Sequence, residues 1–88
     1  MTKRYQVIWE TRVRKQDFKK ITASEVRRIV KKVESHLAEN PTAGTQLKGH
    51  YKGLWRYRVG DYRVIYDIQD TQVTIRIVRV GHRREVYD

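Results

Sequence analysis

The stretch of residues 54–66 constrains the fold of this chain more than any other. It contains two short runs in which aromatic or β-branched residues alternate with charged ones, separated by Gly60 and Asp61. A glycine at this point accepts the positive φ of a two-residue turn at little cost, so the stretch predicts a β-hairpin. The predicted cross-strand pairs are Val59 with Tyr62, Arg58 with Arg63, Tyr57 with Val64, and Arg56 with Ile65.

Alternation along the two strands sorts the hairpin side chains into two faces. The apolar face consists of Trp55, Tyr57, Val59, Tyr62, Val64 and Tyr66. The other face, here called the arginine face, carries Arg56, Arg58 and Arg63. Arg58 and Arg63 would repel each other across the hairpin unless an anion lies over them. The arginine face is therefore the first candidate for a functional site.

Two further strands are predicted on either side of this hairpin in the sequence. Residues 73–80 alternate and follow a turn at Asp70 and Thr71, so they form a third antiparallel strand that brings Arg76 to the arginine face. The pairs expected from that turn are Asp67 with Thr74, Ile65 with Arg76, and Arg63 with Val78. Residues 5–9 are rich in aromatic and β-branched residues and predict an N-terminal strand.

Two helices are expected between the first strand and the hairpin. Residues 11–20 have a weakly helical pattern and predict a short helix. The second helix begins at a capping box, in which Thr22 caps backbone N–H groups and Glu25 reaches back, and it ends before Pro41. Its apolar stripe contains Val26, Ile29, Val30, Val33 and Leu37.

These elements predict an α+β fold in a single domain of residues 1–88. The small antiparallel sheet would combine the N-terminal strand with a C-terminal three-stranded meander. Two N-terminal helices would pack on its apolar face and leave the arginine face open.

Charge points to a polyanionic partner. The chain has 20 Lys and Arg residues against 10 Asp and Glu, a net charge of +10. Phosphate backbone is the obvious polyanion, and its binding should weaken steeply with salt. A merely basic surface and an acidic protein partner remain alternatives. We expect no disulfide, metal site or cofactor, because the chain lacks cysteine and its three histidines are far apart in sequence. No signal peptide or membrane-spanning run is recognisable, so a cytoplasmic location is expected.

Two further segments carry candidate binding or catalytic groups. The loop of residues 41–53 contains Lys48 and Lys52, and it could be a phosphate clamp or a plain connector. Residues 81–87 begin with a glycine that we expect to end the last strand. Their candidate groups, which could fold back over the arginine face, are His82, Arg83, Arg84 and Tyr87.

Three ordered segments resemble the RelE branch of the RelE/ParE superfamily of type II toxins. They are Leu-Lys-Gly at residues 47–49, the hairpin with its preceding glycine at residues 53–66, and Val-Gly-His-Arg-Arg-Glu-Val-Tyr at residues 80–87. The resemblance implies a small antiparallel sheet backed by two helices. It also implies an mRNA interferase acting in the ribosomal A site, inhibited by a cognate antitoxin in a hetero-oligomeric complex.

The resemblance also assigns roles to individual residues. The family's basic and arginine positions match Arg56, Arg63 and Arg83, and its terminal tyrosine matches Tyr87. Leu54 stands where the best-studied pattern has a lysine, and some relatives carry a histidine at the position of His82.

Cleavage without a metal can use a ribose 2′-OH as nucleophile, which requires a proton acceptor, a proton donor and cations around the phosphate. The arginines would stabilise charge, His82 would transfer a proton, and Tyr87 would stack on or position a base. Further RNA contacts are expected from Lys48, Lys52, Arg58, Arg76 and Arg84. A ParE-like gyrase inhibitor and a non-catalytic nucleic-acid-binding module are the alternatives.

Overall fold

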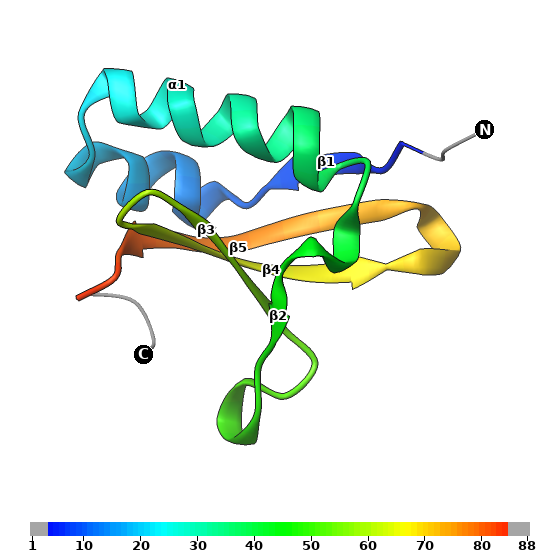
Figure 1. Cartoon of the computed structure of the whole chain (residues 1–88). Helices are drawn as coiled ribbons and strands as arrows, with labels where there is room; N and C mark the ends of the chain where they lie inside the picture. Colours follow the sequence, from blue (N-terminus) through cyan, green and yellow to red (C-terminus); the bar gives the residue numbers. More distant parts are fainter. Residues whose placement is uncertain (1–3, 85–88) are drawn as a thin grey trace.

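A five-stranded sheet lies under two helical segments that cover one of its sides (Figure 1). The computed structural model describes residues 4–84. Its strand order is β1-β5-β4-β3-β2. The α+β class and the placement of both helices on one face of the sheet are confirmed. The strands are β1 (Gln6–Trp9), β2 (Thr45–Gln46), β3 (Trp55–Val59), β4 (Tyr62–Gln69) and β5 (Thr74–His82).

The predicted hairpin is confirmed in every pair. In β3 and β4, Arg58 stands opposite Arg63 and Arg56 opposite Ile65. Gly60 has a φ of +60°, the left-handed conformation that the two-residue turn requires. A Cβ at Gly60 would lie 2.8 Å from a guanidinium nitrogen of Arg28, because this arginine crosses the turn from the overlying helix.

The predicted pairing of β4 with β5 is wrong. Asp67 stands opposite Arg76 instead of Thr74, because the connection is longer than a two-residue turn. It contains a 3₁₀ turn, Asp70–Gln72, followed by Val73 in the left-handed region at a φ of +49°. A shift of two residues keeps the side-chain faces unchanged, so Arg76 still lies on the face predicted for it.

A β-bulge then changes the faces at the end of β5. Tyr66 pairs with Ile77 but Ile65 pairs with Arg79, so Val78 is an extra residue in the strand. Arg63 therefore stands opposite Gly81 instead of Val78. Gly81 does not end the strand as expected, since β5 continues through His82.

Both edges of the sheet differ from the prediction, one in strand direction and the other by an additional strand. β1 pairs with β5 in parallel, which makes the sheet mixed. The loop predicted at residues 41–53 contains the two-residue strand β2, which pairs with the start of β3. It also contains two short 3₁₀ turns, Pro41–Ala43 and Gly49–Tyr51.

The helical layer supplies one side of the core. Its first segment, at the predicted position, consists of a wide π-type turn, Val13–Asp17, and a 3₁₀ turn, Phe18–Lys20. The second is α1 (Ala23–Lys32), extended by another wide turn, Val33–Leu37. Thr22 caps α1 as predicted, accepting the Glu25 N–H at 3.4 Å.

Fully buried residues from both layers meet between the helices and the sheet. Each fully buried aliphatic side chain contributes roughly 1.5–3 kcal/mol to folding relative to an exposed one. The most deeply buried are Val13, Ile29, Val33, Leu37, Val64, Tyr66, Ile75 and Ile77.

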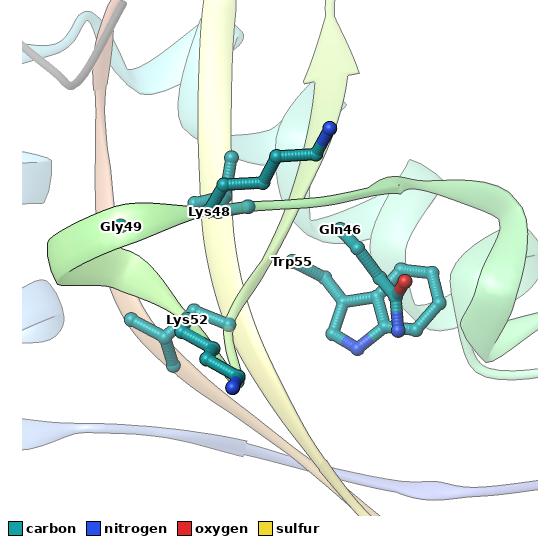
Figure 2. Close-up of a pocket in the computed structure, with 8 residues that line it drawn as sticks. Gln46, Lys48, Gly49, Lys52 and Trp55 are labelled. Atoms are coloured by element: carbon teal, nitrogen blue, oxygen red, sulfur yellow. The ribbon is translucent and has the colours of Figure 1, made fainter.

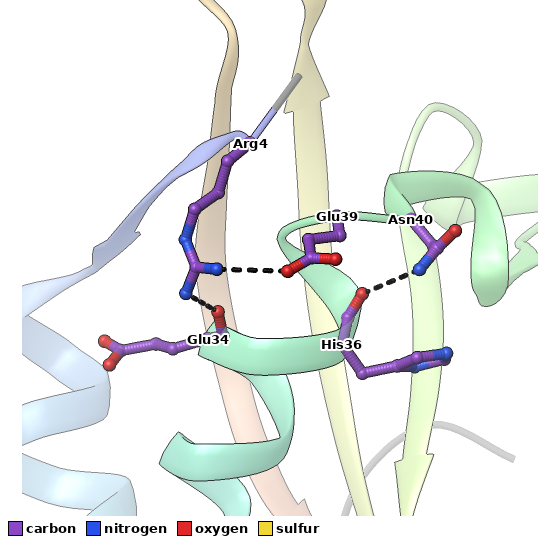
Figure 3. Close-up of polar contacts among 5 residues, drawn as sticks. All are labelled: Arg4, Glu34, His36, Glu39 and Asn40. Atoms are coloured by element: carbon purple, nitrogen blue, oxygen red, sulfur yellow. Dashed lines mark hydrogen bonds and ion pairs between the residues drawn. The ribbon is translucent and has the colours of Figure 1, made fainter. Parts of the chain in front are cut away.

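Polar contacts join the start of the chain to the end of the second helical segment (Figure 3). Arg4 donates to the Glu39 carboxylate at 3.2 Å and to the Glu34 carbonyl. The Asn40 side chain donates to the His36 carbonyl at 3.2 Å, which caps the last helical turn. These side chains are exposed, so their contribution to stability is small.

The hydroxyl of Tyr66 connects the sheet to the chain that leaves the helices. It donates to the Pro41 carbonyl at 2.6 Å and accepts the Gly44 N–H at 3.2 Å. A Cβ at Gly44 would lie 2.4 Å from the Arg56 carbonyl oxygen, so the backbone approaches β3 too closely for any side chain. Burial raises the pKa of Tyr66 to about 12.

Asp17 holds the bulged end of β5. Its buried carboxylate accepts the Val80 N–H at 2.9 Å. β1 ends opposite Ile77, so this carboxylate replaces the strand that would otherwise have paired with β5 beyond that residue.

Tyr66→Phe tests the hydroxyl connection. The substitution leaves the half-buried Gly44 N–H without its partner, so it should lower the free energy of unfolding by about 0.5–1.5 kcal/mol at neutral pH. Because the folded pKa is raised from 10.0 to about 12, the hydroxyl's contribution is complete below pH 10 and is lost as the pH rises through about 12. Denaturant unfolding should show that the difference in free energy of unfolding between the parent and the variant becomes smaller from pH 10 to about pH 12. A difference that stays constant over this pH range would contradict the stabilising role of the Tyr66 hydroxyl.

Asp17→Ala should lower the free energy of unfolding by about 1–3 kcal/mol, because it leaves the Val80 N–H buried without an acceptor. Asp17→Asn is the matched control, since its amide oxygen can still accept this hydrogen bond. It should lose less stability than the alanine variant in the same urea titration. Equal losses would mean that the carboxylate does not hold β5 through this hydrogen bond.

Candidate nucleic-acid interface

The arginine face of the hairpin lies on the side of the sheet opposite the helices. Arg58 is exposed, and Arg56 and Arg63 are half-buried. Among residues 4–84, no carboxylate lies within ion-pair distance of Arg56 or Arg58. Their charges are therefore uncompensated by the described part of the chain, which suits this face to bind an anion.

Arg76 differs from the hairpin arginines in its surroundings. It forms an ion pair with Glu10 at 3.4 Å and stands opposite Asp67 in the β4–β5 ladder. Two acidic groups therefore reduce the positive potential around this predicted RNA-binding residue.

The loop before β3 covers part of the face that was predicted to be open. Leu47 and Leu54 pack against Ile65 and Val78, forming a small apolar cluster separate from the main core. Lys48 and Lys52 are exposed on this loop. They line a cavity of about 400 Å³ next to Trp55, shown in Figure 2.

The bulge in β5 separates His82 from the arginine face. His82 stands opposite Tyr62, whose side chain belongs to the helix-covered face, and the two rings meet edge to face with centroids 5.7 Å apart. It lines a polar cavity of about 180 Å³ together with Arg12, Asp17 and Arg79. The expectation that His82 folds back over the arginine face is therefore wrong.

Arg83 lies at the hairpin end of the sheet. Its backbone N–H donates to the Asp61 carbonyl at 2.8 Å, so it is next to the turn that joins β3 and β4. Arg84 follows in the same turn and is exposed. Tyr87, the remaining predicted site residue, lies outside the described residues.

Two polar groups near the site were not predicted from the sequence. Arg79 stands opposite Ile65, a position that depends on the bulge and has no marker in the sequence. The His36 Nδ1 atom lies 2.7 Å from the Tyr57 hydroxyl, and burial raises the pKa of that tyrosine. This pair joins the helical layer to β3 beneath the arginine face.

The described residues contain no candidate metal site and no candidate membrane-spanning helix. No group of three or more histidine or carboxylate side chains could hold a metal ion within residues 4–84. In the same part of the chain, no helix is long and apolar enough to cross a membrane.

Comparison with known proteins identifies close relatives over nearly the whole chain. Residues 7–87 match the family model described as the ParE toxin of the type II toxin-antitoxin system parDE. The toxin RelG of Mycobacterium tuberculosis is 31% identical over 84 residues, covering 94% of this chain and 95% of that protein.

Solved structures of RelE toxins have the same fold as this chain. The M. tuberculosis toxin–antitoxin complex RelBE2 matches with a TM-score of 0.86 and 30% identity, covering 94% of this chain and 98% of the matched chain. The archaeal RelE–RelB complex from Pyrococcus horikoshii has a TM-score of 0.68 and 25% identity, covering 96% and 100%. A mutant of E. coli RelE in the free state, at 22% identity and TM-score 0.73 over 94% and 87%, supports the fold alone. The chain therefore belongs to the RelE/ParE superfamily of type II toxin–antitoxin toxins, as a RelE-like member.

Proposed function

We propose that this toxin is an mRNA interferase that cleaves mRNA in the ribosomal A site and so inhibits translation. The observation that carries the proposal is the arginine face, where Arg56 and Arg58 have no carboxylate partner among residues 4–84. A cationic face on a small sheet suits the phosphates of an RNA strand. Membership of the RelE-like toxins makes mRNA the preferred substrate among polyanions.

The proposed reaction is metal-independent attack of a ribose 2′-OH on its own adjacent phosphate. The new bond joins the 2′ oxygen to phosphorus, and the bond from phosphorus to the 5′ oxygen of the next nucleotide breaks. One group accepts the 2′ proton and another supplies a proton to the departing 5′ oxygen. Positive side chains stabilise the charge that accumulates on the phosphate oxygens in the transition state.

We assign charge stabilisation to Arg56, Arg63 and Arg83. Arg83 is tied to the hairpin turn, so the scissile phosphate would lie over the end of the sheet where β3 and β5 finish and β4 begins. His82, on the helix side of that same end, is our candidate for proton transfer. Tyr87 is proposed to stack on or position a base.

The remaining cations are proposed to bind the flanking RNA. Lys48, Lys52, Arg58 and Arg84 are exposed, which leaves them accessible to phosphates. Arg76 is the weakest member of this group, because Glu10 pairs with it at 3.4 Å.

A cognate antitoxin is the proposed protein partner. The M. tuberculosis RelBE2 and P. horikoshii RelE–RelB structures are toxin–antitoxin complexes, which supports the same arrangement here. An acidic antitoxin segment would neutralise the arginine face and add buried area to a small core. We propose that toxin and antitoxin form a hetero-oligomeric complex and that the free toxin acts in the cytoplasm.

Inhibition of DNA gyrase is the second candidate function. It is favoured by the family model that matches this chain, which describes a ParE toxin. Such a toxin would act by binding a protein and would need no proton-transfer group.

Mapping the 5′ ends of cellular RNA after brief induction of the toxin separates these functions. New ends that follow the codon phase within translated regions support the interferase. Induction of the DNA damage response without such ends would support gyrase inhibition and contradict our proposal. Absence of both, from a toxin that is folded and expressed, would indicate a non-catalytic binder.

Arg63→Ala should reduce single-turnover cleavage on programmed ribosomes by about 10²–10³-fold, the loss typical when one transition-state donor is removed. Arg27→Ala is the matched control, because it removes the same charge from an exposed position on α1. It should cleave at nearly the parental rate. Equal losses in the two variants would mean that only net charge matters.

His82→Ala should slow the cleavage step by about 10²–10⁴-fold while mRNA binding changes little, if His82 transfers a proton. Cleavage rates that are equal in parent and variant would remove His82 from the mechanism and leave the assignment of the arginines intact.

A further inference from the structure

The loop between β2 and β3 encloses a cavity that the proposed cleavage mechanism does not use (Figure 2). Its volume is about 400 Å³, within the range of small-ligand sites. Its apolar wall comes from Leu47, Leu54 and Trp55, and Lys48 and Lys52 lie at its edges. None of its eight lining residues is acidic.

Backbone hydrogen bonds hold the loop around this cavity. Leu47 donates to the Leu54 carbonyl at 2.9 Å, which extends the pairing of β2 and β3 by one step. Beyond that pair, Gly49 and Gly53 have φ values of +66° and +96°, so both glycines are needed to turn the chain back. The cavity is therefore formed before any ligand binds.

Trp55 is fixed in its place on the cavity wall. Its ring stacks on Tyr66 at a centroid distance of 6.2 Å and an interplanar angle of 27°. Tyr66 is fully buried, and its hydroxyl is bound to Pro41 and Gly44. Binding against Trp55 would therefore cost little ordering of the protein.

The chemistry of the cavity matches one nucleotide. A base is flat and largely apolar on its faces, and it is followed and preceded by a phosphate. An aromatic wall and two lysines in the same cavity offer a contact for each of these parts. An acidic peptide would satisfy the lysines but would have no group that requires the aromatic wall.

The cavity adjoins the arginine face through Leu54, whereas its Trp55 wall packs against the main core on the other side of the sheet. Leu54 lines the cavity and also packs in the cluster with Ile65, which stands opposite Arg56. The cavity lies at the start of β3, and the hairpin turn lies at its end, about 13 Å away at the usual rise per residue. An RNA strand that crosses the arginine face could therefore reach both places.

We propose that this cavity binds one unpaired nucleotide of the RNA, with its base against Trp55 and its flanking phosphates at Lys48 and Lys52. This inference rests on the proposed function, since it names a subsite for the same RNA. A nucleotide held there would set which phosphate reaches the hairpin end, so the cavity would contribute to the choice of cleavage position.

The test uses a toxin in which Trp9→Phe leaves Trp55 as the single tryptophan of the chain. The probe is a short single-stranded RNA with 2′-O-methyl groups throughout, which binds but cannot undergo attack by a 2′-OH. A second probe has the same length and abasic sugars. The proposal predicts that the first probe changes the fluorescence of Trp55 and shields it from acrylamide, and that the abasic probe does neither.

Variants give an independent measurement of the same subsite. Trp55→Leu should weaken binding of the methylated RNA by about tenfold, the scale of one lost stacking contact. Lys48→Ala with Lys52→Ala should reduce the slope of log affinity against log salt by about 1.4, because each phosphate contact on a single strand contributes about 0.7. The control is the double variant Lys31→Ala with Lys32→Ala, which also removes two positive charges but on the exposed side of α1. It should leave the slope unchanged.

These outcomes test the nucleotide site separately from the proposed mRNA interferase activity. Equal signals from the two probes, or unchanged binding in both pocket variants, would overturn the nucleotide site even if the toxin cleaves mRNA. A Trp55 signal produced by an acidic peptide and not by RNA would also overturn it. In a further outcome, the toxin cleaves no mRNA in cells while the methylated RNA still changes the fluorescence of Trp55. That result would contradict the proposed interferase activity and support the nucleotide site. If Trp55→Leu does not fold, the lysine variants still decide.

Discussion

The opposition of Arg58 and Arg63 across the hairpin is the constraint on which the rest of this structure depends. Two like charges directly opposite each other destabilise a hairpin by roughly 0.2–1 kcal/mol. The pair is kept because Tyr57, Val59 and Val64 are buried under the helices on the other face. A register slip of one residue would bury the arginines and expose these side chains, so the core holds the cationic face in the open.

The second determinant of the site is the extra residue in β5. Without the bulge at Val78, simple alternation would direct His82 to the same side as the arginines. With it, His82 stands opposite Tyr62, and Asp17 supplies the acceptor that the bulged strand lacks. Arg63, Arg83 and His82, our candidate for proton transfer, therefore lie around the hairpin end of the sheet, which is why we place the reacting phosphate there.

Local features of this fold could be predicted from the sequence, and distant or irregular ones could not. The hairpin register follows from Gly60, and the start of α1 follows from Thr22, because each signal lies within a few residues of the element that it controls. The β4–β5 connection could not be predicted, since Val73 adopts a left-handed φ of +49° that β-branched residues rarely take. The bulge at Val78 likewise has no glycine to mark it. The parallel pairing of β1 depends on a partner far along the chain.

The central claim is that RNA binds the sheet face carrying Arg56, Arg58 and Arg63, and the most direct measurement is amide chemical-shift mapping by NMR. The toxin would be titrated with the uncleavable 2′-O-methyl RNA at low and at high salt. If RNA binds this face, amide signals of β3, the hairpin turn and the end of β5 shift at low salt, and those of α1 do not. Shifts confined to α1, or shifts that persist unchanged at high salt, would contradict it.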